Sequence, residues 1–117
     1  MTFARNYILT INNPEMNEAE FYEFCTKLDH IKYFIFQREK GTETETEHYQ
    51  VYIEFCVSKR FDTIKGYFPT AHIEKRNGTK MQAKEYCSKE ETRMGDVFEY
   101  GELVFGGSGT CFCYNRA

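Results

Sequence analysis

The chain has 117 residues, of which 41% are hydrophobic and 17% aromatic, enough for one domain with its own core. Its formal net charge of −3 argues against a protein that coats DNA without sequence preference. No apolar run approaches the ~18 residues of a membrane span, and the N-terminus lacks the pattern of a signal peptide.

The first half of the chain predicts a strand, a helix and a hairpin. Residues 6–11 are rich in β-branched and aromatic side chains, and the turn residues 12–14 end this strand. Asn17 and Glu20 form the pattern of a capping box, and the hydrophobic spacing after them predicts an amphipathic helix. Strands at 33–40 and 48–57 flank a polar, acidic loop. Alternation assigns to the core face Tyr49, Val51, Ile53, Phe55 and Val57.

The second half adds two helices and two strands. A short helix begins at Ser58 or Lys59 and ends near Pro69, and a strand at 71–76 ends in an Asn77-Gly78 turn. Thr79 with Gln82 forms another capping box, which opens a helix. A last strand covers residues 97–105. We expect one domain over residues 1–105, and the Gly-rich composition of residues 106–117 predicts a flexible linker or an expression tail.

The predicted order β-α-β-β-α-β-α-β indicates an α+β fold of the ferredoxin-like, split β-α-β type. We expect an antiparallel sheet with its helices on one face, so that the other face is free to hold a site. The five cysteines form no zinc-binding pattern, and we expect reduced thiols.

Basic residues concentrate in one part of the chain. Residues 59–89 contain eight Lys and Arg residues against three acidic ones, while the remainder is acidic. This imbalance predicts a local anion-binding surface, and a solvated charge pattern without a partner is the alternative.

The predicted hairpin brings together three possible metal ligands. If Glu39 and His48 close the hairpin, Glu39 lies opposite His48 and Gln37 lies opposite Gln50. One carboxylate, one imidazole and one amide oxygen on the non-core side then form a site that favours Mg²⁺ or Mn²⁺. The alternative is a surface hairpin that merely carries polar side chains.

The late helix carries a candidate nucleophile. Tyr86 and Lys89 are three residues apart, so a helix places them on nearly the same face. A phenol becomes a useful nucleophile when a cation or metal assists at the group it attacks. The alternative is an amphipathic helix with a core tyrosine and a solvated lysine.

Three motifs in this order resemble one enzyme family: Thr10-Ile11-Asn12-Asn13, His48-Tyr49-Gln50 and Tyr86-Cys87-Ser88-Lys89. Over residues 5–104 the chain resembles the N-terminal endonuclease domain of Rep proteins of circovirus- and nanovirus-like viruses, within the HUH superfamily. The second histidine of the superfamily motif is replaced by Gln50, a change that these viral members share.

The resemblance implies an activity. Tyr86 would attack single-stranded DNA at a stem-loop replication origin and form a 5′-phosphotyrosine link, which is later resolved by rejoining. Glu39, His48 and Gln50 would bind Mn²⁺ or Mg²⁺, and Lys89 would position the metal or the phosphate. The enzyme would start rolling-circle replication of a viral genome in the host nucleus, without a membrane partner, and the full-length protein would carry a helicase domain downstream.

Candidates for DNA contact are cationic side chains and two asparagines that could read base edges. They are Arg5, Asn12, Asn13, Lys59, Arg60, Lys75, Arg76, Lys80 and Lys84.

Two other functions remain open. One is a non-enzymatic single-strand binder with the fold of an RNA-recognition module, although the usual aromatic signature is missing. The other is an initiator with the same chemistry from a plasmid or mobile element.

Overall fold

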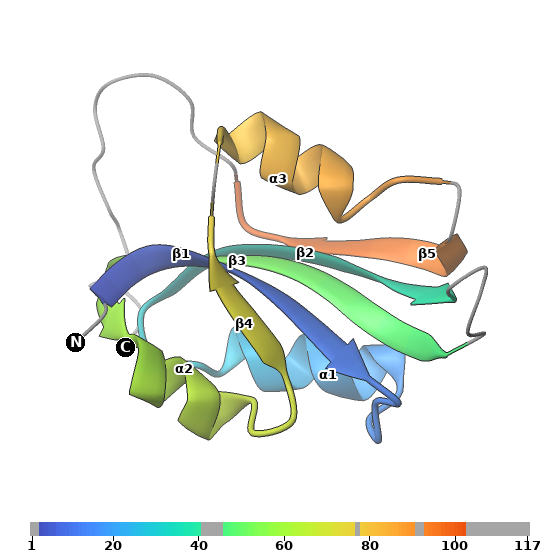
Figure 1. Ribbon diagram of the computed structural model, residues 1–117, viewed down its shortest axis with the longest axis horizontal. Coiled ribbons are helices and arrows are strands. Elements are labelled where there is room, and N and C mark those ends of the chain that lie inside the picture. Colours follow the sequence, from blue (N-terminus) through green and yellow to red (C-terminus); the bar gives the residue numbers. More distant parts are fainter. Residues whose placement is uncertain (1–2, 41–45, 77, 91–92, 103–117) are drawn as a thin grey trace.

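A single antiparallel sheet of five strands organises the chain, in the spatial order β4-β1-β3-β2-β5 (Figure 1). The computed structural model describes residues 3–40, 46–76, 78–90 and 93–102. Its elements are β1 (Phe3–Asn12), α1 (Glu18–Thr26), β2 (Ile31–Lys40), β3 (Glu47–Arg60), α2 (Phe61–Tyr67), β4 (His72–Lys75), α3 (Lys80–Tyr86) and β5 (Arg93–Tyr100). Strand β3 lies between β1 and β2, the strands that flank α1, so the predicted split β-α-β class is confirmed.

Both predicted capping boxes are present. The Asn17 side chain accepts a 2.9 Å hydrogen bond from the backbone N–H of Glu20, whose carboxylate accepts from the Asn17 N–H at 2.9 Å. Thr79 and Gln82 make the same reciprocal pair at the start of α3. Each pair satisfies backbone donors that a helix start leaves without a partner, which explains where these helices begin.

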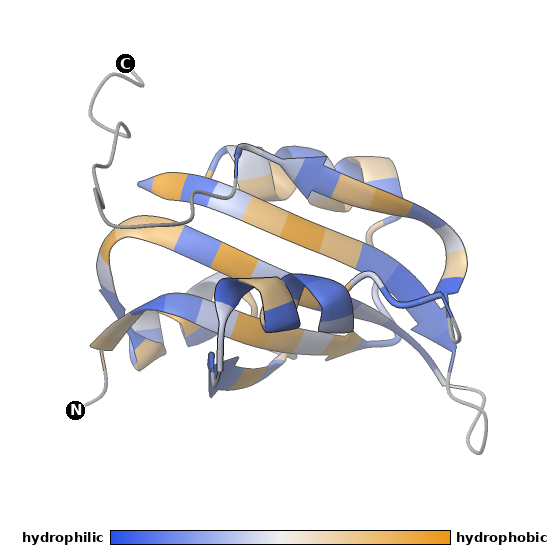
Figure 2. Cartoon of the chain, turned by 90° about the horizontal axis from the view of Figure 1, so that it is seen from above, coloured by the Kyte–Doolittle hydropathy of each residue, from blue (hydrophilic) through white to orange (hydrophobic). Residues whose placement is uncertain are grey.

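The main core lies between the sheet and helices α1 and α2. Phe21 of α1 is at its centre, with ring centroids 4.8 Å from Phe36, 4.9 Å from Tyr49 and 5.9 Å from Phe68. The central strands are hydrophobic through their middle and more hydrophilic at their ends (Figure 2). The alternation of inward and outward side chains along β3 buries four of its five predicted core-face residues. The fifth, Val57, is 40% exposed because β2 pairs with β3 only as far as Phe55.

Helix α3 lies on the opposite face of the sheet from α1 and α2 (Figures 1 and 2). Its buried residue Ala83 and the following Cys87 form a second cluster with Tyr33, Ile35 and Tyr52. The expectation that all helices cover one face is therefore wrong for α3. Alternation along β3 places Tyr52 on this second face, and packing under α3 removes its aromatic ring from water.

Two element boundaries differ from the prediction. Helix α2 begins at Phe61 because β3 continues to Arg60, which pairs with Phe3. Strand β5 begins at Arg93 because it pairs with β2 along the sheet edge, and this pairing includes polar residues that have low strand propensity. Residues 103–105 of the predicted last strand lie outside the described residues, as do residues 41–45 of the acidic loop, Asn77 of the turn and the segment 106–117.

The cysteine prediction holds in part. The expectation of reduced thiols is met by Cys25 and Cys87, which are free and buried. No helix in the described part of the chain has the length and apolar character to cross a membrane.

We expect Ile53→Ala to lower the free energy of unfolding by about 2–5 kcal/mol, because it leaves a cavity beneath the central strand. Val57→Ala on the same strand should cost less than about 0.5 kcal/mol, because its side chain is substantially exposed. Urea unfolding of both variants measures the difference. Equal losses would contradict the assignment of Val57 to the surface.

Candidate functional site

Two rows of polar side chains cross the sheet on the face that carries α3. Strand pairing places Glu39 opposite His48 and Gln37 opposite Gln50, as predicted. Strands β1 and β5 extend these pairs into the rows Asn12–His48–Glu39–Arg93 and Thr10–Gln50–Gln37–Val97. Because directly opposite residues project to one face, all three predicted metal ligands share one surface.

The carboxylate and the imidazole are close together. His48 Nε2 lies 3.2 Å from Glu39 Oε1, and the Glu39 side chain is only 2% exposed. Gln50 is 3% exposed in the adjacent row, and His48 is partly open to solvent. The site therefore has two buried oxygen-bearing side chains and one more accessible imidazole.

The amide of Gln50 is oriented by its partners. Its Nε2 donates to the backbone carbonyl of Leu9 at 3.2 Å, and its Oε1 accepts from the Thr10 hydroxyl at 3.2 Å. Since a carbonyl accepts only, these contacts identify which end of the amide is nitrogen. The oxygen retains a second lone pair that is available to a ligand.

The spacing of Glu39 and His48 suits a hard divalent cation. Octahedral Mg²⁺ with ligands at about 2.1 Å places adjacent ligand atoms about 3 Å apart, close to the separation of Glu39 Oε1 and His48 Nε2. Within the described ranges, no group of three or more His, Cys, Asp or Glu side chains could hold a metal ion. A cation bound to Glu39 and His48 would therefore need a different third protein ligand, and the amide oxygen of Gln50 is suitable.

Lys89 connects this ligand set with Tyr86. Its Nζ lies 3.9 Å from Glu39 Oε1 and 4.5 Å from the centroid of the Tyr86 ring. Tyr86 is the last residue of α3 and is 48% exposed, so the alternative of a core tyrosine is wrong. The Lys89 ammonium group thus lies between the exposed Tyr86 ring and the buried carboxylate of Glu39.

The neighbour of Tyr86 is not a competing nucleophile. Cys87 is fully buried beneath α3. Burial raises the pKa of its thiol, and the charge of Glu39 adds to this shift. The thiol therefore stays protonated and anchors the end of the helix, while Tyr86 faces outward.

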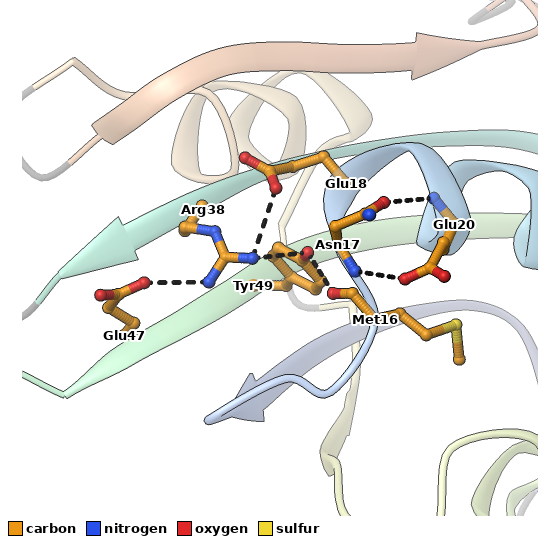
Figure 3. A network of polar contacts seen from close by, with 7 residues as sticks. All are labelled: Met16, Asn17, Glu18, Glu20, Arg38, Glu47 and Tyr49. Atoms are coloured by element: carbon orange, nitrogen blue, oxygen red, sulfur yellow. Dashed lines mark hydrogen bonds and ion pairs between the residues drawn. The ribbon is translucent and has the colours of Figure 1, made fainter.

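Arg38 supports the site from the opposite face of β2. Its guanidinium donates to Glu47 at 2.9 Å, to Glu18 at 3.3 Å and to the Tyr49 hydroxyl at 2.9 Å, and that hydroxyl donates to the Met16 carbonyl at 2.6 Å (Figure 3). This network joins the start of α1 to both strands of the hairpin. These contacts therefore stabilise the β2–β3 strand register that places Glu39 opposite His48.

A second polar cluster, which the sequence did not reveal, lies on the same face. Glu54 is 1% exposed and accepts a hydrogen bond from Tyr52, and Arg76 Nη1 donates to the Tyr52 hydroxyl at 2.9 Å and lies 3.8 Å from Glu54. Burial and the hydrogen bond to Glu54 raise the pKa of Tyr52. Alternation along β3 places Tyr52 and Glu54 on this face, but only the folded chain shows that both side chains are buried.

The candidates for DNA contact do not form one patch. Asn12 lies in the row of His48, whereas Lys59 and Arg60 are at the other end of β3, roughly 35 Å away along the strand. Lys59 Nζ lies 3.3 Å from the His30 ring nitrogen, and Lys84 of α3 is paired with Glu99 at 3.2 Å. The exposed members of the set are Arg5, Asn12, Asn13, Arg60 and Lys75, and Lys80 is partly exposed.

The chain matches a known protein family. Residues 4–90 match the family model described as "Putative viral replication protein". The chain is 39% identical over 97 residues to the master replication protein of Banana bunchy top virus, covering 83% of this chain and 31% of that protein. It is 36% identical over 108 residues to the replication-associated protein of Beak and feather disease virus, covering 90% and 37%.

A further relative is the replication-associated protein of Porcine circovirus 1, which is 38% identical over 88 residues, covering 74% of this chain and 28% of that protein. The chain thus spans about a third of the length of these curated relatives. The resemblance inferred from the three motifs is confirmed.

Arg76→Met should lower the free energy of unfolding by about 3 kcal/mol, because it removes the cation that lies 3.8 Å from the buried carboxylate of Glu54 and that donates to the Tyr52 hydroxyl. Lys75→Met is the matched control, since Lys75 is exposed and its loss should change stability by less than about 0.5 kcal/mol. Thermal and urea unfolding measure both. Similar stabilities for the two variants would show that Arg76 does not support the fold.

Proposed function

The chain belongs to the viral replication protein family, and from that membership we propose that it is a metal-dependent, sequence-specific endonuclease and strand transferase acting on single-stranded DNA. It would start rolling-circle replication of a circular viral genome. The observation that carries the proposal is the position of Lys89, whose Nζ contacts both Glu39 and the ring of Tyr86. A nucleophile, a cation and a buried ligand set are the parts that a phosphoryl transfer requires.

The reaction is a transesterification at one phosphodiester. The Tyr86 oxygen attacks the phosphorus and the bond from phosphorus to the 3′ oxygen breaks. The phenol proton passes to solvent, and the departing 3′ oxygen takes up a proton. One P–O bond forms as another breaks, so the energy stays in the 5′-phosphotyrosine link and no nucleotide cofactor is consumed. Attack by a 3′ hydroxyl on this link rejoins the strand.

The polar rows assign roles to side chains. Glu39, His48 and Gln50 would hold Mn²⁺ or Mg²⁺, which supplies positive charge to the phosphate when bound. The Lys89 ammonium, which lies over the Tyr86 ring, would orient the phenol and hold a phosphate oxygen. Exposure of Tyr86 leaves its hydroxyl accessible to a DNA strand.

DNA would approach from the open side of α3. Asn12 is exposed at the end of the row that contains His48 and is suited to contact a base edge. The partly exposed Lys80 on α3 is a candidate for a phosphate contact, whereas Lys75 lies opposite the core residue Tyr7 and projects from the other face of the sheet. Since the chain covers about a third of its relatives, a downstream helicase domain and action in the host nucleus are expectations for the whole protein.

The alternative of an RNA-recognition-like binder has less support. Such modules stack bases on exposed aromatic residues of the sheet. Here Tyr33 and Tyr52 are fully buried under α3, so they cannot serve as a platform. The relatives described above are viral proteins, which favours a viral initiator over one from a plasmid.

We expect Tyr86→Phe to abolish the covalent DNA adduct and to leave DNA binding within about twofold, because only one exposed hydroxyl is lost. The measurement is a denaturing gel of protein mixed with a single-stranded stem-loop origin, in Mn²⁺ or in EDTA. The wild type should give a band that survives denaturant and requires the metal. An equally strong adduct from the variant would exclude Tyr86 as the nucleophile.

His48→Ala should remove Mn²⁺-dependent cleavage, because the site then loses its imidazole beside Glu39. His72→Ala on β4 is the control, since that exposed histidine pairs with Glu74 rather than with the ligand set. The same gel assay, with Mn²⁺ titrated, compares the two. Wild-type turnover by the His48 variant would discard the proposed metal site.

A further inference from the structure

Gln37 is a fully buried polar residue with no role in the reaction described above. It lies on β2, two residues before Glu39 and directly opposite Gln50. Alternation along the strand therefore places its side chain on the face of the candidate metal ligands. A buried amide at this position needs a physical reason, because an apolar residue would suit the interior better.

The amide nitrogen of Gln37 makes two hydrogen bonds. It donates to Glu39 Oε2 at 2.7 Å and to the backbone carbonyl of Lys89 at 2.7 Å. Both partners are acceptors only, so both amide hydrogens are used and the orientation of the side chain is defined. One side chain thus joins the carboxylate on β2 to the backbone just after α3.

The two oxygens of the Glu39 carboxylate have different partners. Oε2 accepts from Gln37, while Oε1 faces His48 Nε2 at 3.2 Å and Lys89 Nζ at 3.9 Å. The oxygen that faces the other candidate ligand is therefore the one that Gln37 leaves unused. A hydrogen bond to the second oxygen restricts rotation of the carboxylate, which is how outer partners tune a ligand.

We propose that Gln37 is a positioning residue that aims Glu39 Oε1 at the metal and fixes the distance between the ligand set and the tyrosine helix. The inference rests on the proposed function, since it requires a metal at Glu39, His48 and Gln50. The link to Lys89 extends the effect to the nucleophile, because the Lys89 side chain lies over the Tyr86 ring.

Glutamine suits this position better than other residues. A carboxylate would repel Glu39 and could not donate to the Lys89 carbonyl, and an apolar side chain would leave both acceptors without their donor. The Gln37 oxygen itself is buried without a hydrogen-bond partner in the part of the chain that the structure describes. A buried acceptor beside the ligand set is consistent with a donor that arrives with the ligand, such as a water bound to the cation.

The test is Mn²⁺ affinity measured by electron paramagnetic resonance on the whole chain without DNA. Gln37→Met keeps the buried volume and removes both hydrogen bonds, and it should weaken Mn²⁺ binding about 10- to 100-fold. At saturating Mn²⁺ the covalent adduct should still form more slowly than in the wild type, because the Lys89 backbone is no longer held.

Tyr33→Phe is the matched control. Tyr33 is fully buried on the same strand and face, and its hydroxyl donates to Glu99 at 2.5 Å, away from the ligand set. This variant should lose stability and keep wild-type Mn²⁺ affinity. Thermal melting shows whether each variant is folded, and Gln37→Asn, which retains an amide too short to reach both acceptors, replaces Gln37→Met if the latter does not fold.

The outcomes separate this inference from the proposed function. A folded Gln37 variant that binds Mn²⁺ within twofold of the wild type overturns the positioning role and leaves the proposed function intact. A wild-type protein that binds no Mn²⁺ overturns both. Weakened binding in the Gln37 variant, with unchanged binding in the Tyr33 variant, supports the inference.

Discussion

The pairing of β2 with β3 is the constraint on which the rest of this structure depends. It places Glu39 opposite His48 and Gln37 opposite Gln50. A slip of one residue would send each of these side chains to the other face, into the aromatic core around Phe21. The register is therefore protected by core packing, because any alternative would bury charged groups among aromatic rings.

Three consecutive residues of β2 tie this hairpin to helices on both sides of the sheet. Arg38 points toward α1 and holds Glu18, while Gln37 and Glu39 point toward α3 and contact Lys89. The two-residue period of a strand makes this division automatic. The candidate site thus lies at the hairpin end of two inner strands of the sheet, and Tyr86 is brought toward it by a helix anchored through Ala83 and Cys87.

The adjacent residues Tyr86 and Cys87 at the end of α3 differ in exposure, and this difference has a chemical consequence. Cys87 is buried and its thiol pKa is raised by burial, whereas the adjacent Tyr86 is exposed. The more reactive type of side chain is thereby kept inside the protein, and the less reactive phenol faces the substrate side.

The sequence by itself determined the order of elements, both helix caps, the hairpin register and the identity of the three candidate ligands. Each follows from local chemistry, such as the cap of Asn17 or the alternation along β3. Only the tertiary structure decided that α3 crosses the second face, that Arg76 pairs with Glu54, and that Gln37 reaches the Lys89 carbonyl. Arg76 and Glu54 are 22 positions apart in the sequence, and Gln37 and Lys89 are 52 positions apart. No local sequence pattern specifies such contacts, because they depend on how the buried side chains of the sheet face pack together.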